Sequence, residues 1–232
     1  MIGITGTNAR PSIAPTFGVE NMLGTNPLTF AMPSDEPFPF FLDCATSVSQ
    51  RGKIEVYARE GKALPPGWVI DENGRTRTDT LPILDDLIAG KAALTPLGGL
   101  GEETAGYKGY GYATVVEILS AALQHGTFLK GLLGFSPEGR KQPYHLGHFF
   151  IAIDIASFIE PEDFKRTTGE ILRQLRQSRK APGCERIYTA GEKEYLTSLE
   201  RERHGVPVNE ALQQVLKTLQ KQYHLDQYHF AF

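Results

Sequence analysis

One segment of the chain carries a carboxylate, a thiol and hydroxyls on consecutive small residues. It reads Asp43, Cys44, Ala45, Thr46 and Ser47. Small side chains let a backbone approach a ligand closely, and hydroxyl and backbone N–H groups can bond phosphate or ribose oxygens. The residues alone leave two interpretations open. The segment either binds a nucleotide, or its acid and hydroxyls cap a helix predicted over Thr46 to Ala58, with Thr46 or Ser47 as the N-cap.

A lysine among glycines forms a second candidate site. Lys108 lies in the stretch Gly106-Tyr107-Lys108-Gly109-Tyr110-Gly111, just before a predicted helix. A cation, free N–H donors and the positive end of a helix dipole together suit a diphosphate. The stretch is not a Walker loop, because the GxxxxGK[ST] order is absent, and no GxGxxG follows a predicted strand. A Rossmann nucleotide site is therefore not expected.

Histidine and cysteine placement limits the other chemistries. The chain has 6 histidines: His125, His145, His148, His204, His224 and His229. No spacing among histidine, cysteine and acidic residues is typical of a metal site, so no metal is predicted. The 2 cysteines, Cys44 and Cys184, fit no disulfide framework. That usage favours a reducing compartment, and the cytoplasm is the default location.

Composition describes an ordinary globular protein of 232 residues, with 41% hydrophobic and 22% charged residues. The net charge of -3 gives no sign of the basic surface by which proteins bind nucleic acid. A basic group, Arg173 to Lys180, is read as the solvated end of a helix. The sequence contains neither a long apolar run nor a basic-then-apolar leader, so neither a membrane span nor a signal peptide is expected.

Hydrophobic periodicity predicts the elements that must position these residues. The expected strands are Met1–Thr5, Pro27–Met32, Phe38–Asp43 and His148–Ile155. The helix after Gly111 should bury one apolar face: Tyr112, Val115, Val116, Leu119, Ala122 and Leu123. C-terminal helices are expected over 161–179, 193–204 and 209–223. The stretch from about 61 to 106 is rich in glycine, proline and polar residues and is predicted to be an irregular surface excursion. We therefore expect an α/β fold, a mixed sheet with flanking helices, in one domain over 1–232.

The order of three motifs resembles one enzyme family. Leu23-Gly24-Thr25-Asn26-Pro27, Leu42 to Ser47 and Gly106 to Gly111 are similar to segments of the malate/L-lactate dehydrogenase family, which lacks a Rossmann fold. That family includes ureidoglycolate dehydrogenase and diketogulonate reductase. The resemblance runs from Ile2 to about Gln220. It implies a homodimeric, NAD- or NADP-dependent oxidoreductase that moves a hydride to or from a small 2-hydroxy or 2-oxo acid.

The resemblance also implies roles for particular residues. The implied cofactor-binding residues are Asp43, Cys44, Ala45, Thr46, Ser47, Tyr107, Lys108, Gly191, Glu192 and Lys193. The last three belong to a segment similar to the family's PGE-like segment, with Ala190 in place of the usual proline. By the same resemblance, Asn8 and Thr25 shape the substrate site. Read from the residues alone, Asn8 and Asn26 are turn residues.

The proton-transferring histidine of the family has no counterpart among these residues. It lies in an N-terminal helical segment that the resemblance does not cover, so the sequence reads as an N-terminally truncated dehydrogenase. Asp43 is expected in a supporting role, since an acid can orient a histidine. His148 matches a histidine whose place in the family reads as structural, and it is the remaining candidate base. The alternative function is an inactive fragment that binds nucleotide or dimerises.

Overall fold

The computed structural model describes residues 1–136 and 138–232. These form two compact units, Met1–Ala190 and Gly191–Phe232. That the chain forms one dehydrogenase domain over 1–232 stays a prediction. The first unit contains every strand of the described residues, and the second contains the last two helices.

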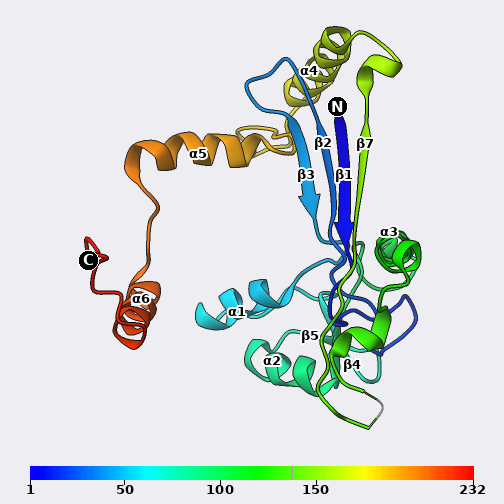
Figure 1. Cartoon of the computed structure of the whole chain (residues 1–232), viewed down its shortest axis with the longest axis vertical. Helices are drawn as coiled ribbons and strands as arrows, with labels where there is room; N and C mark the ends of the chain where they lie inside the picture. The colour runs from blue at the N-terminus through cyan, green and yellow to red at the C-terminus, as the bar shows by residue number, and fades with distance from the viewer. Residues whose placement is uncertain (137) are drawn as a thin grey trace. The chain divides into compact units, whose positions relative to one another are not determined.

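The main sheet has four strands in the order β3-β2-β1-β7 (Figure 1). These are β3 (Phe40–Cys44), β2 (Leu28–Met32), β1 (Ile2–Thr7) and β7 (His148–Ile153), and each adjacent pair is antiparallel. The four predicted strands are confirmed. The register places Ile4 opposite both Phe30 and Ile151. Because side chains alternate along a strand, such partners line one apolar face.

The stretch predicted to be irregular is in fact ordered, so that prediction was wrong. It holds β4 (Val69–Asp71), β5 (Thr76–Arg77) and β6 (Ala92–Leu94), which form a second sheet in the order β5-β4-β6, and helix α2 (Thr80–Ala89). Strands of two or three residues are too short to show a period, which explains the error. The stretch supplies three of the fully buried members of the main core, which are Ile13, Ile54, Val69, Ile83, Leu94 and Ala113.

Helix α1 begins later than predicted. It spans Arg51–Arg59, and its N-cap residue Gln50 makes no side-chain capping bond. Thr46 and Ser47 therefore do not cap this helix, and the capping interpretation of the Asp43–Ser47 segment is wrong. Both side chains are buried in the connection between β3 and α1.

Helix α3 (Gly106–Ala121) buries a different face from the one that periodicity indicated. Its buried positions are Gly106, Gly109, Ala113, Val116, Glu117, Ser120 and Ala121. Of the predicted stripe, Tyr112 and Val115 are about half exposed and Leu123 is three-quarters exposed. The helix packs on β1 and β7 through small residues, which allow a close approach. Three short 3₁₀ helices complete this part of the chain: η1 (Ala122–Gln124), η2 (Leu129–Leu133) and η3 (Ile155–Ser157).

Helix α4 (Pro161–Gln177) starts with proline at its first turn, as expected, and lies at the end of the sheet away from α1 and α2 (Figure 1). Only Gly169 and Leu172 are buried along it. Arg173 bonds the carboxylates of Asp35 and Glu36 at 2.9 Å. The basic group is thus partly an ion-pair anchor on the β2–β3 connection rather than a solvated face.

The second unit is helical. Helix α5 (Glu192–His204) ends at Gly205, whose φ is 75°. Helix α6 (Glu210–Gln222) is capped by Asn209, whose side chain accepts a bond from the Leu212 N–H at 2.9 Å. Both predicted helices and the Asn209 cap are confirmed. Within the described residues, no helix is long and apolar enough to span a membrane.

Candidate functional site

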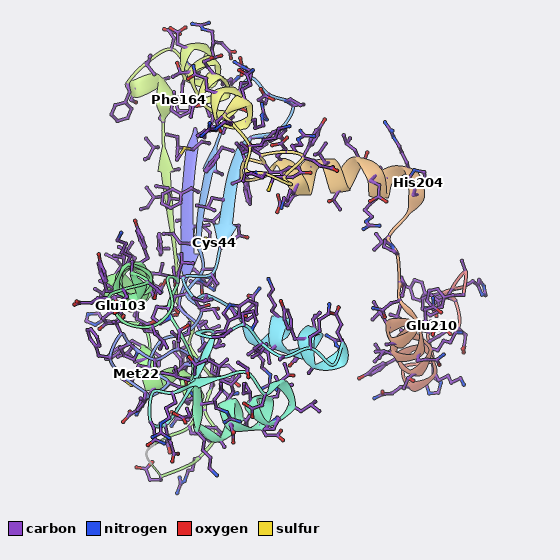
Figure 2. All side chains as sticks on the ribbon, turned by 180° about the vertical axis from the view of Figure 1, so that it is seen from behind. Met22, Cys44, Glu103, Phe164, His204 and Glu210 are labelled. Carbon is purple, nitrogen blue, oxygen red and sulfur yellow. The ribbon has the colours of Figure 1, made fainter. Side chains whose placement is uncertain are left out.

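The ends of the main-sheet strands bring the candidate segments together. In the antiparallel register, Gly6 lies opposite Leu28, Leu28 lies opposite Cys44, and Thr7 lies opposite His148. The loop after β1, the loop before β2 and the loop after β3 therefore leave the sheet at one end. Figure 2 shows Cys44 at this end of β3, where the sheet meets the part of the unit that carries α1 and α2.

The loops after β1 and before β2 are in direct backbone contact. A Cβ on Gly24 would lie 2.5 Å from the carbonyl oxygen of Ala9, so only glycine fits there. The Ala9 N–H donates to the Asn26 side-chain oxygen at 3.2 Å. The motif glycine that the resemblance singled out thus has a packing reason, and it fixes the spacing of the two loops.

Thr46 joins the Asp43–Ser47 segment to these loops. Its N–H donates to the carbonyl of Thr25 at 2.9 Å, and its hydroxyl donates to the carbonyl of Asn26 at 3.0 Å. Its own carbonyl accepts a bond from the Leu97 N–H at 2.9 Å. The hydroxyl that sequence reasoning offered to a ligand or a helix is therefore used to hold loops together.

Leu97 in turn contacts the glycine-rich turn of α3. A Cβ on Gly109 would lie 2.2 Å from the Leu97 carbonyl oxygen and 2.4 Å from its nitrogen. The backbone of α3 consequently lies directly on the backbone of Leu97, whose N–H also bonds the Thr46 carbonyl. The two segments proposed to bind a nucleotide, Asp43–Ser47 and Gly106–Gly111, are thus held together across one residue.

A buried carboxylate, which sequence analysis missed, connects the remaining parts. Glu117 of α3 is 6% exposed. It accepts bonds from the Asn26 side-chain amide at 2.8 Å and from the Leu129 N–H at 2.8 Å, and a longer one from Asn8 at 3.4 Å. A lone acid inside an apolar helical pattern was the available signal, since buried charges require such donors.

The Asn8 side chain is fully buried and bonded at both ends. Its oxygen accepts from the Gly147 N–H at 2.9 Å, and its amide donates to the Thr127 carbonyl at 3.0 Å. These two bonds hold the loop after β1 against Thr127 and against the residue that precedes β7. The backbone carbonyl of Thr25 accepts a bond from the Thr46 hydroxyl at 3.1 Å, which ties Thr25 to the loop after β3.

The groups left facing solvent are those suited to a charged ligand. Lys108 and Tyr107 are exposed, and the Lys108 ammonium lies 5.9 Å from the Tyr107 ring centroid. Helix α3 has no acidic residue in its first turn and no side-chain cap, and it follows Ala105 in the left-handed conformation, with φ of 62°. The Gly106 N–H bonds the Gly101 carbonyl at 3.1 Å and the Lys108 N–H bonds the Ala105 carbonyl at 3.0 Å, so the exposed Lys108 ammonium is the group available to an anion at this helix start.

Asp43 and Cys44 are also exposed. The Asp43 carboxylate accepts a bond from the Thr29 hydroxyl at 2.8 Å across the β2–β3 pair. Partial burial, and then the Asp43 charge, raise the pKa of the Cys44 thiol. The thiol is therefore protonated near neutral pH, and Cys44 can offer a weak S–H donor rather than a thiolate.

The other predicted residues are placed as follows. His148 is exposed at the first position of β7. Gly191, Glu192 and Lys193 lie at the start of α5 in the second unit, where Gly191 has a φ of 89° and Glu192 is buried. Among the described residues, no group of three or more histidine, cysteine or acidic side chains could hold a metal ion.

Comparison with known proteins identifies relatives along nearly the whole chain. The family model described as malate/L-lactate dehydrogenase matches residues 1–217. Malate dehydrogenase of Pyrococcus horikoshii is 42% identical over 221 residues, which are 95% of this chain and 59% of that protein. L-sulfolactate dehydrogenase of Methanocaldococcus jannaschii is 36% identical over 221 residues, 94% of this chain and 58% of that protein.

A solved structure is similar as well. The crystal structure of malate dehydrogenase from Entamoeba histolytica superposes with a TM-score of 0.91 at 42% identity and covers 100% of this chain and 63% of that one. The chain spans less than two thirds of the length of each of these relatives.

Proposed function

Because the chain belongs to the malate/L-lactate dehydrogenase family, we propose that it transfers a hydride between a nicotinamide cofactor and a small 2-hydroxy or 2-oxo acid. The observation that supports the proposal is that Thr46 and Gly109 both contact the backbone of Leu97. These two contacts place the loop that follows the exposed Asp43 and Cys44 beside the cationic start of α3, and a dinucleotide needs both a wall for its nucleosides and a cation for its diphosphate.

The proposed cofactor residues differ in chemistry and are therefore assigned different roles. Lys108, Tyr107 and the start of α3 hold the diphosphate, because they combine a cation with a helix N-terminus. Asp43, Cys44, Ala45, Thr46 and Ser47 form the wall beside it. The bound cofactor supplies the hydride chemistry, and the protein supplies orientation and electrostatics.

The substrate is proposed to contact the loops of Asn8 and Thr25. Asn8 would shape the substrate site by fixing the loop after β1, since its own side chain is buried and fully hydrogen-bonded. Asp43 is assigned as a positioning residue for the proton-transferring group, and His148 is the candidate for that group within this chain. A homodimer in the cytoplasm is part of the same proposal.

The test measures NADH affinity by calorimetry in wild type and in Lys108→Ala. Loss of one charge-assisted contact should weaken binding by about 1 to 3 kcal/mol. Lys62→Ala is the matched control, because Lys62 is exposed and pairs with Glu60 instead. Unchanged affinity in Lys108→Ala would remove the assignment. NADH binding with no turnover of any 2-oxo acid would favour the alternative, a nucleotide-binding protein without catalysis.

A further inference from the structure

Helix α3 carries a second functional candidate besides Lys108, in its C-terminal half. Glu117 is 6% exposed, and the donors that bond its carboxylate are two side-chain amides and one backbone N–H. Burying a carboxylate is costly unless hydrogen bonds replace the water that it loses. Neutral donors replace that water here, so the burial of the charge and the positions of the donors depend on each other.

Both oxygens of Glu117 are bonded by groups from other parts of the chain. Oε2 accepts from the Asn26 side-chain amide at 2.8 Å. Oε1 accepts from the Leu129 N–H at 2.8 Å and from the Asn8 side-chain amide at 3.4 Å. A carboxylate offers only acceptors, so each asparagine is held with its NH2 group toward Glu117 and its oxygen turned away.

The oxygens of the two asparagines fix the backbone of the neighbouring loops. The Asn26 oxygen accepts from the Ala9 N–H at 3.2 Å, and the Asn8 oxygen accepts from the Gly147 N–H at 2.9 Å. Both asparagine side chains are fully buried. Glu117 therefore determines which way the two amides face, and the amides hold the loop after β1 and the residue that precedes β7.

The loops that Glu117 holds are those proposed for the acid, whereas the proposed diphosphate group is fixed in another way. The bonds of Glu117 reach the loop after β1 and the loop before β2. The turn that carries Lys108 is held instead by the close contact of Gly109 with the backbone of Leu97. Loss of the Glu117 bonds should therefore affect the acid loops and leave the cation in place.

We propose that Glu117 is a positioning residue for the acid: it fixes the loops of Asn8 and Asn26 and so sets the affinity for a 2-oxo acid, while it contacts neither the acid nor the cofactor. This inference rests on the proposed function. Ordering a loop on binding lowers affinity, so a site binds most tightly when its loops are already ordered. Loops released from Glu117 would have to be ordered by the acid itself, and the affinity for the acid would fall.

The test replaces the carboxylate with an amide of similar size in Glu117→Gln. One oxygen then becomes an NH2 group that faces another donor, so at least one of the bonds is lost. The affinity for oxamate is measured by calorimetry at saturating NADH, because oxamate has the shape of pyruvate and its amide carbonyl is not reduced by NADH. We expect Glu117→Gln to bind oxamate at least about 10-fold more weakly than wild type, with an unchanged affinity for NADH.

Thr95→Val is the matched control for a loss of stability alone. Thr95 is buried, and its hydroxyl donates to the Gly67 carbonyl in the part of the unit that holds the second sheet. Valine has nearly the same shape but removes this buried bond, so the melting temperature should fall. The affinity of Thr95→Val for oxamate should equal that of wild type. A merely structural role for Glu117 would make Glu117→Gln behave like this control.

A measurement on the wild type does not depend on whether the variant folds. Oxamate binding in the presence of NADH should slow amide exchange at Leu129 and Gly147, because the first bonds Glu117 and the second bonds Asn8. Amide exchange at Leu129 that oxamate leaves unchanged would overturn the inference.

The remaining outcomes separate the inference from the function on which it rests. Oxamate affinity in Glu117→Gln equal to that of wild type would overturn the inference, as would a parallel loss of NADH affinity. Wild type that binds NADH but not oxamate would remove the acid from the proposed function and the inference with it. Weakened oxamate binding in Glu117→Gln, with unchanged NADH affinity in Lys108→Ala, would leave the inference standing and remove only the cofactor assignment.

Discussion

Replacing Gly109 with alanine should destabilise the protein, although alanine is the better helix former. The added Cβ would lie 2.2, 2.4 and 2.7 Å from the oxygen, nitrogen and Cα of Leu97. All three are backbone atoms, so a side-chain rotation cannot relieve the clash. Overpacking of this kind costs about 1 to 3 kcal/mol, and the helix preference of alanine returns about 0.5 to 1 kcal/mol. We expect a net loss of about 1 to 2 kcal/mol in the free energy of unfolding.

Gly111 in the same helix is the matched control, because a Cβ there would meet nothing within 4 Å. Gly111→Ala should therefore stabilise the protein by about 0.5 to 1 kcal/mol. Urea unfolding followed by the fluorescence of Trp68, the single tryptophan, gives the midpoint and slope for each variant. Gly109→Ala should also weaken NADH binding, since a shift of Leu97 breaks its bond to Thr46. Equal shifts of the midpoint in both variants would refute the reasoning.

Further predictions concern Arg77 and Asp43. Arg77 bonds Asp79 and Asp86, and its hydrogen bond lowers the pKa of Asp79. The stabilisation that the Arg77–Asp79 pair contributes is therefore complete above about pH 4, the ordinary pKa of an aspartate, and is lost as pH falls through the lowered pKa of Asp79. Arg77→Gln should cost about 1 kcal/mol at pH 7. The urea midpoints of wild type and variant should converge as pH falls below the lowered pKa of Asp79, and a constant difference would contradict this. Asp43→Asn should slow NADH-dependent reduction of a 2-oxo acid by about 10²-fold with little change in melting temperature. A parallel loss of stability would assign Asp43 to the β2–β3 pairing alone.

Sequence reasoning succeeded where a local pattern decided the structure. The short apolar runs of β1, β2 and β7, the proline that opens α4 and the Asn209 cap of α6 are all local signals, and each element formed. The motif order also identified the family, because glycines such as Gly24 and Gly109 are required by contacts that tolerate no side chain.

It failed where a distant partner decided the structure. Thr46 has an ordinary capping residue's chemistry, yet its hydroxyl bonds the carbonyl of Asn26, twenty positions away. The buried face of α3 follows from what packs on it, so Val115 is exposed while Glu117 is buried. The bonds of Glu117 to Asn8 and Asn26 could not be inferred from spacing, because their partners lie 109 and 91 positions away.

The same carboxylate has a consequence for how the site is assembled. Its bond to Asn8 joins residues 109 positions apart, and the Asn8 side chain also accepts a bond from the Gly147 N–H, 139 positions away. Closing such long loops costs chain entropy before the stabilising contacts can form. Contacts between residues so far apart in sequence therefore slow folding. During refolding, the compact core around Ile54 and Ile83 should therefore become protected before the loops that Glu117 joins. The capacity to hold a ligand is, on this view, acquired at the last kinetic step.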